Sequence, residues 1–164
     1  MAHSPLFYVG QTDLIGEILL RNDDRLNNRL ADPGVVLADA TLWWDASSTS
    51  SGQDDLDSLS EVFPEDLAGR LPRFTESLRK TVRNVERDTQ VSLLSEEWTS
   101  AMAMLEESRV RNIAISLAVE IGLRDRSDRS IEEVRQALTS IIRVCRVARA
   151  SGIPVVVGTG PEFK

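Results

Sequence analysis

A long two-sided helix that runs straight into an apolar strand, between Ser130 and Gly158, constrains the fold more than any other part of the sequence. Apolar residues recur at steps of three and four, and charged residues take the remaining faces, as in a helix with one buried stripe. Ser130, with Glu133 three residues later, predicts the start of this helix as a capping box, and Gly152 predicts its end. The residues that follow, 153–157, predict a short buried strand. The stripe consists of Ile131, Val134, Leu138, Ile141, Cys145 and Ala148.

The architecture expected from this stretch is a layered α/β domain. A helix that delivers a buried strand is half of an αβ unit, so we predict a helix-rich α/β fold with a small, mainly parallel sheet. With 164 residues, 41% of them hydrophobic, the chain predicts a single domain over 1–164. The Ser-rich segment 46–57 predicts a mobile loop within it. Further strands are predicted at 6–9, 35–44 and 91–94, and further helices at 12–30, 56–63, 64–71, 73–87, 95–105 and 110–123.

The composition excludes several classes of function. Cys145 is the only cysteine and His3 the only histidine, which excludes an intrachain disulfide framework, a His/Cys zinc site and histidine-based catalysis. No run of 18 apolar residues and no signal peptide is found, so we expect a cytoplasmic protein that does not span a membrane. Net charge is −7, with 13 acids and 3 bases in residues 1–66, so we do not expect a general nucleic-acid-coating surface.

One short motif points to chemistry. An apolar strand runs into Asp39, and a carboxylate at the end of a buried strand is costly unless it is hydrogen-bonded, paired or bound to a metal. The pattern of Asp39, Thr41, Trp43 and Asp45 resembles the first motif of the PIN-domain nucleases, including VapC-type toxins. The resemblance implies a central parallel sheet and an acidic pocket that binds Mg²⁺ or Mn²⁺ to hydrolyse RNA.

Two further acids are assigned through the same resemblance. The segment 91–98, with Glu97 at the start of a helix, is similar to the second acidic motif of the family. Asp125 and Asp128 are the candidates for the third acid, and Asp128 is the one we assign. The resemblance therefore implies that Asp39, Glu97 and Asp128 together hold the metal and form the catalytic site. The alternative for each of these acids is structural, with Asp39 capping a turn, Glu97 favoured by a helix dipole and Asp128 lying in a charged turn.

A second function explains other residues. Trp43 and Trp44 are adjacent in a predicted strand and therefore point to opposite faces, so that one of them is expected at the surface. Val144 and Val147 widen the apolar surface of the long helix, which is then either buried on two sides or shared with another chain. These four residues predict an interface in a non-catalytic subunit that self-associates, as in a viral or phage-type complex, or that binds a protein partner.

Overall fold

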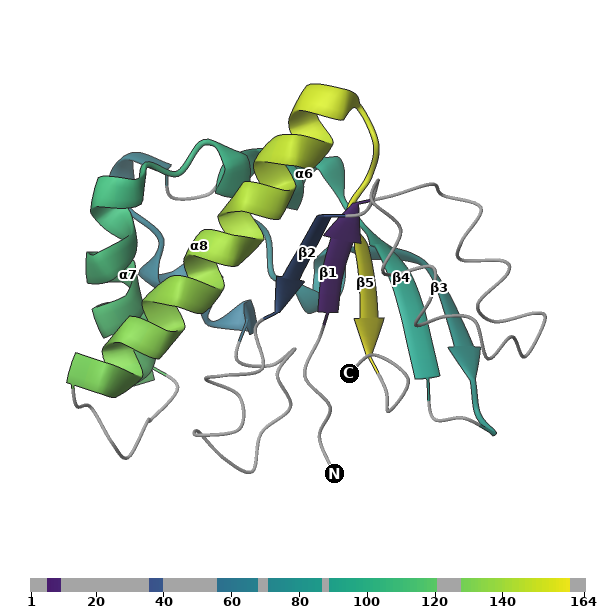
Figure 1. The fold of residues 1–164 in the computed structure, drawn as a ribbon, viewed down its shortest axis with the longest axis horizontal. Helices are drawn as coiled ribbons and strands as arrows, with labels where there is room; N and C mark the ends of the chain where they lie inside the picture. The colour runs from purple at the N-terminus through teal and green to yellow at the C-terminus, as the bar shows by residue number, and fades with distance from the viewer. Residues whose placement is uncertain are drawn as a thin grey trace.

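The computed structural model describes residues 6–9, 36–39, 56–67, 71–86, 89–120 and 128–159. Five strands form one sheet in the order β2-β1-β5-β4-β3, with helices gathered at its β2 end (Figure 1). The strands are β1 (Leu6–Val9), β2 (Val36–Asp39), β3 (Leu78–Asn84), β4 (Thr89–Leu94) and β5 (Val156–Thr159). The helices are α5 (Leu59–Val62), α6 (Glu96–Ala103), α7 (Glu107–Glu120) and α8 (Asp128–Ser151), with two 3₁₀ turns at Glu65–Leu67 and Thr75–Ser77.

The sheet is antiparallel, so the predicted mainly parallel sheet is wrong. All four strand pairings, β2 with β1, β1 with β5, β5 with β4 and β4 with β3, are antiparallel. The helix-to-strand unit at the end of the chain is present, but α6, α7 and α8 together return the chain beside β4 in the opposite direction. The mixture of helices and strands was predicted from local patterns, whereas strand direction depends on the path of the whole connection.

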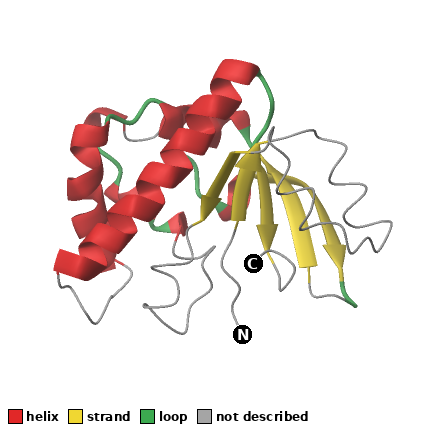
Figure 2. Ribbon diagram, viewed as in Figure 1, coloured by secondary structure: helices red, strands yellow, loops and turns green. Residues whose placement is uncertain are grey.

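The long helix α8 packs across the sheet at its β2–β1 end (Figures 1 and 2). It begins at Asp128, two residues before the predicted capping box, and its predicted stripe is buried at Val134, Leu138, Ile141, Cys145 and Ala148, with Ile131 half-buried. Its predicted end is confirmed, because Gly152 takes the left-handed conformation with φ of 70°. With 24 residues it is about 36 Å long, and it also packs against α6 and α7.

A cluster of three aromatic rings joins the sheet to the helices. Trp98 of α6 stacks on Phe7 of β1 with ring centroids 6.3 Å apart, and Phe74 packs edge-on against Trp98 at 5.2 Å. All three side chains are fully buried. Ser95 caps α6 as expected, since its hydroxyl accepts a hydrogen bond from the Trp98 backbone N–H, and the helix therefore enters the core at a fixed position.

The segment 73–87 departs from its prediction. A helix was expected there, but residues 78–84 form strand β3, which pairs with β4 as an edge strand. The spacing of Leu78, Val82 and Val85 suits a helix locally, and pairing with β4 overrides that preference. The predicted loop 46–57 and the predicted helix 12–30 fall largely or wholly outside the described residues, although Leu56 and Asp57 are helical and buried.

Candidate functional site

The sheet register places two of the predicted metal ligands far apart. Asp39 pairs with Leu6, which pairs with Gly158, which in turn pairs with Val91 in β4. Glu97 follows the opposite end of β4, beyond Leu94. From Asp39 to Leu94 the backbone is therefore displaced by three residues, about 10 Å, along the strands and by three strand spacings, about 14 Å, across them. Asp39 and Glu97 do not converge on one ion.

Asp128 lies at yet another place. It is the first residue of α8, whereas Glu96, the neighbour of Glu97, lines a pocket with Gly152 just beyond the last residue of that helix. The length of α8, about 36 Å, thus separates Asp128 from the Glu97 end. Among the described residues, no three His, Cys, Asp or Glu side chains lie close enough together to hold a metal ion.

The predicted interface residues on α8 are covered within this chain. Val144 is fully buried and Val147 is half-buried against the core, so α8 is buried on two sides, which is the first of the two alternatives raised by its sequence. Trp43 and Trp44 lie outside the described residues. The surface that α8 leaves open carries arginine instead.

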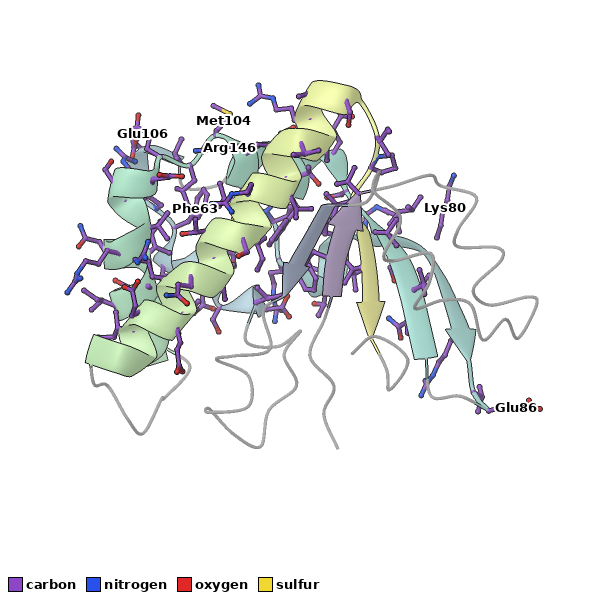
Figure 3. All side chains as sticks on the ribbon, in the orientation of Figure 1. Phe63, Lys80, Glu86, Met104, Glu106 and Arg146 are labelled. Atoms are coloured by element: carbon purple, nitrogen blue, oxygen red, sulfur yellow. The ribbon has the colours of Figure 1, made fainter. Side chains whose placement is uncertain are left out.

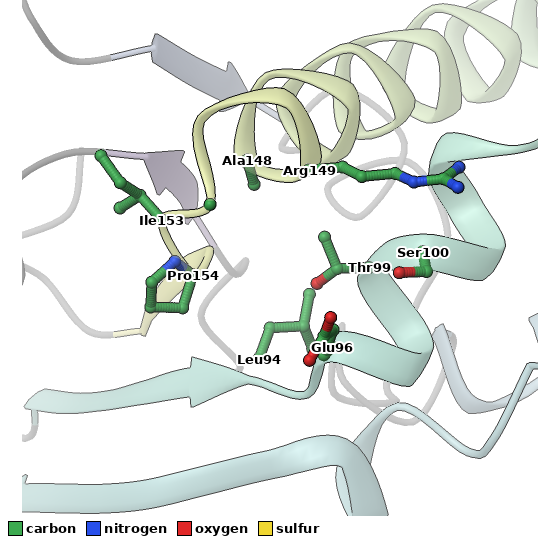
Figure 4. A pocket seen from close by; sticks show the side chains of 9 residues that line it. Leu94, Glu96, Thr99, Ser100, Ala148, Arg149, Ile153 and Pro154 are labelled. Atoms are coloured by element: carbon green, nitrogen blue, oxygen red, sulfur yellow. The ribbon is translucent and has the colours of Figure 1, made fainter.

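A small pocket lies where α6 begins and α8 ends (Figure 4). It has a volume of about 240 Å³ and combines an apolar floor with two exposed charged side chains, Glu96 and Arg149. The Thr99 hydroxyl on its wall donates to the Ser95 carbonyl at 2.9 Å and is therefore already engaged. The remaining lining residues are Leu94, Ser100, Ala148, Gly152, Ile153 and Pro154.

The second half of α8 is strongly basic. From Arg135 to Ser151 the helix carries four arginines and no acid, although the chain as a whole has a net charge of −7. Arg143, Arg146 and Arg149 are exposed at intervals of three residues, and together with the exposed Met104 we call them the α8 arginine face. Neither Arg143 nor Arg149 forms a hydrogen bond or ion pair with the described part of the chain. These two guanidinium groups are free to bind an anion.

Arg146 has a structural role within this face. Its Nε donates to the Ala103 carbonyl at 3.2 Å, and a terminal nitrogen donates to the Leu105 carbonyl at 2.6 Å. It thereby satisfies carbonyl groups at the end of α6 and clamps the turn between α6 and α7. Met104 lies in that turn with 44% of its surface exposed, beside Arg146 (Figure 3). An apolar side chain is thus held next to a row of positive charges.

A polar groove between α7 and α8 continues the same surface. It has a volume of about 450 Å³ and is lined by Glu107, Arg135, Gln136, Thr139, Ser140 and Arg143. Arg135 is paired with Glu132, and its hydrogen bonds hold the pKa of the Glu132 carboxyl below its usual value. Glu107 lies 4.0 Å from Arg146. Among the described residues that line this groove, Arg143 is therefore the cation without an ion-pair partner.

Other buried polar groups serve the fold. The carboxylate of Asp57 accepts hydrogen bonds from the backbone N–H of Thr75 at 2.7 Å and from its hydroxyl at 2.8 Å, and lies 3.4 Å from Arg73. Burial raises the pKa of the Cys145 thiol far above its usual value, which keeps this free cysteine unreactive. The Trp98 indole N–H is buried and has no hydrogen-bond partner among the described residues.

The arginine face could have been recognised in the sequence. The interval of three residues between Arg143, Arg146 and Arg149, and the absence of acids around them, are visible there. In the sequence alone they form the polar side of an amphipathic helix, which is compatible with a local arginine groove. The position of Met104 beside them could not have been predicted, because it depends on how the α6–α7 turn packs against α8.

Comparison with known proteins identifies no relative. The chain matches no protein-family model, no curated protein and no solved structure. Within its described residues, no helix has both the length and the apolar character needed to cross a membrane.

Proposed function

We propose that this protein is a non-catalytic subunit that binds a partner through the α8 arginine face. The observation that supports the proposal is the pair of exposed guanidinium groups of Arg143 and Arg149, which have no partner among the described residues of a chain with net charge −7. On such a chain, a local cluster of like positive charges favours a partner with negative charge. We also propose that it acts in the cytoplasm, in keeping with its single, buried thiol.

The chemistry of the face favours an acidic protein segment. Arginine binds carboxylates with two parallel hydrogen bonds and is enriched at protein interfaces. Met104 adds an apolar contact beside the charges, and apolar anchors rather than surface ion pairs supply most of the affinity of an interface. Single-stranded RNA is held largely by stacking of its bases on aromatic rings. The large hydrophobic residues exposed in the described chain are Val85, Met104, Ile115 and Val119, none of which is aromatic, so these residues favour a protein segment over RNA.

A synthetic acidic peptide tests the proposal. We expect a fluorescent peptide of alternating Glu and Leu to bind the protein at low salt, and binding to weaken as salt screens the charges. The double variant R143E/R149E should weaken it about tenfold or more, because attraction becomes repulsion. The matched control is R79E/R83E, which makes the same change of charge on exposed arginines of β3. Equal loss of affinity in both variants would mean that the binding is nonspecific and would contradict the proposal.

The ribonuclease hypothesis is a second proposal with a different requirement. It is supported by β2, an apolar strand that ends at Asp39, although β2 is an antiparallel edge strand and the resemblance to PIN-domain nucleases implies a parallel sheet. In this proposal Asp39 would hold Mg²⁺ or Mn²⁺, which would supply an activated water for RNA hydrolysis. Glu97 would not share that ion, because the sheet register places it at the other end of the sheet.

The same purified protein tests this second proposal. It is incubated with structured and unstructured RNA in Mn²⁺ or Mg²⁺, beside the Asp39→Asn variant and an EDTA control. Cleavage that requires both the metal and Asp39 would establish the ribonuclease function. Intact RNA in every reaction would contradict it and leave partner binding as the function to pursue.

A further inference from the structure

A second surface has the opposite charge to the α8 arginine face. Near the end of α7, Ile115 and Val119 are 38% and 51% exposed. Glu120 follows Val119 on α7, and α5, which packs against α7, carries the exposed Glu61 close enough to raise the pKa of the Glu120 carboxyl. No basic side chain in the described part of the chain pairs with either glutamate. We call Glu61, Ile115, Val119 and Glu120 the α7 acidic end.

The two surfaces are complementary in both of their components. The α8 arginine face presents the guanidinium groups of Arg143 and Arg149 beside the exposed Met104. The α7 acidic end presents two carboxyl groups beside Ile115 and Val119, and no basic side chain of the described residues pairs with either. Three of the four large hydrophobic side chains exposed in the described chain thus lie on these two surfaces. Each surface offers what the other lacks, a countercharge and an apolar contact.

The two surfaces lie too far apart to meet within one molecule. Met104 precedes α7 and Val119 is near its end, so the helix separates them by about 20 Å. We propose that copies of this protein assemble head to tail, with the α8 arginine face of one copy docked on the α7 acidic end of the next. Such a contact is heterologous, so it extends into chains or closes into a ring. This inference rests on the proposed function, since it names a second copy as the partner.

Sedimentation velocity tests the assembly directly. At low salt, we expect the average mass of the wild-type protein to rise with concentration, and about 0.5 M salt to reverse the rise by screening. Two charge-reversed variants, R143E/R149E and E61R/E120R, should each remain monomeric at the same concentrations. In each variant the two surfaces that must meet carry the same charge.

Mixing the two variants tests whether the two surfaces bind each other. The reversed face of R143E/R149E is complementary to the reversed end of E61R/E120R, and their unchanged surfaces are complementary as well. An equimolar mixture should therefore recover the wild-type assembly, which also shows that both variants are folded. The control R79E/R83E should assemble like the wild type.

Three results would overturn the inference. They are a wild-type protein that stays monomeric at low salt, an assembly that both variants retain, and a mixture that fails to recover assembly. Peptide binding separates this failure from failure of the proposed function. If the acidic peptide binds the wild type and not R143E/R149E while the wild type stays monomeric, the α8 arginine face binds a partner other than a second copy.

Discussion

At the residue scale, Asp57 is a buried carboxylate whose hydrogen bonds connect two turns of the fold. Only 7% of its surface is exposed, and its two oxygens accept hydrogen bonds from the backbone and side chain of Thr75. Asp57 thereby connects the helical turn at the start of the 56–67 segment to the 3₁₀ turn that precedes β3. These hydrogen bonds offset the energetic cost of burying the charge.

We expect replacement of this carboxylate to destabilise the protein. Asp57→Ala should lower the free energy of unfolding by about 2–3 kcal/mol, because it removes two hydrogen bonds from Thr75 to a buried, charged acceptor. Asp57→Asn, which keeps one oxygen acceptor, should cost less. The control Asp66→Ala removes an exposed ion pair to Arg109 and should cost about 0–1 kcal/mol. Urea unfolding measures all three, and equal losses at Asp57 and Asp66 would contradict the role given to Asp57.

The pair of Glu61 and Glu120 predicts a dependence of stability on pH. The hydrogen bond and the charge of Glu61 raise the pKa of the Glu120 carboxyl above its usual value of 4.5. Since the folded-state pKa is the higher one, the stabilising contribution of protonated Glu120 is complete at low pH. It is lost as pH rises through the folded-state pKa, above which the two carboxylates repel one another.

Neutralising Glu120 should therefore stabilise the protein at neutral pH. Thermal unfolding of Glu120→Gln is expected at a higher midpoint than wild type at pH 7, with the difference shrinking below about pH 4, where the wild-type carboxyl is protonated. Glu97→Gln is the matched control, because an acid in the first turn of α6 is favoured by the helix dipole and its loss should not raise the midpoint. A gain at Glu120 that is the same at every pH would contradict this account.

At the scale of the element, strand β3 contains the most unusual backbone in the described chain. Lys80 has a φ of 50°, in the left-handed region, and it lies where the pairing of β3 with β4 shifts register between Arg79 and Val82. A bulge with its first residue left-handed is a site where glycine is favoured. Together with the charged side chains, the bulge interrupts an edge strand that would otherwise be free to pair with other chains.

This backbone predicts that glycine is better than lysine at position 80. Lys80→Gly should raise the free energy of unfolding by about 0.5–1 kcal/mol. The left-handed conformation costs a residue with a Cβ about 1–2 kcal/mol, and glycine avoids this cost. Part of the stabilisation is lost because glycine loses more backbone entropy on folding than lysine does. Arg83→Gly, in ordinary strand conformation, should lower it. Chemical denaturation distinguishes the two, and equal losses would show that Lys80 is not strained.

Sequence patterns predicted elements well wherever the pattern is local. The stripe of α8, the cap at Ser95 and the glycine at 152 were all readable, because helix periodicity and end residues act over a few positions. Strand β3 was mistaken for a helix, since its residues gain their conformation from pairing with β4. The direction of the strands was mistaken for the same reason, as β5 reaches β4 only after three helices.

The sequence predicted individual candidate residues, but not which of them lie close together in the fold. Asp39, Glu97 and Asp128 were each plausible acids at the ends of elements, and their separation follows from the antiparallel register, which no spacing along the chain reveals. The arginines of α8 were visible in the sequence, but Met104 joins them only through the clamp that Arg146 places on the α6–α7 turn.

At the scale of the whole molecule, exposed charges of opposite sign gather at two separate places on the helices. The α8 arginine face and the α7 acidic end belong to one layer of helices. Within the described chain, Arg143 and Arg149 pair with no acid and Glu61 and Glu120 pair with no base, whereas Arg146 lies 4.0 Å from Glu107. Separation of this kind costs little in water, where exposed charges are well solvated. It favours binding to other molecules and makes association depend on salt.

Hydrogen exchange of the protein with and without the Glu/Leu peptide, at low salt, tests the central claim most directly. We predict that the peptide slows exchange in the second half of α8 and in the turn between α6 and α7, around Arg143, Arg149 and Met104, and that R143E/R149E abolishes this protection. Protection confined to other elements, such as the end of β2 at Asp39, or the same protection in R143E/R149E, would contradict the claim that the α8 arginine face is the binding surface.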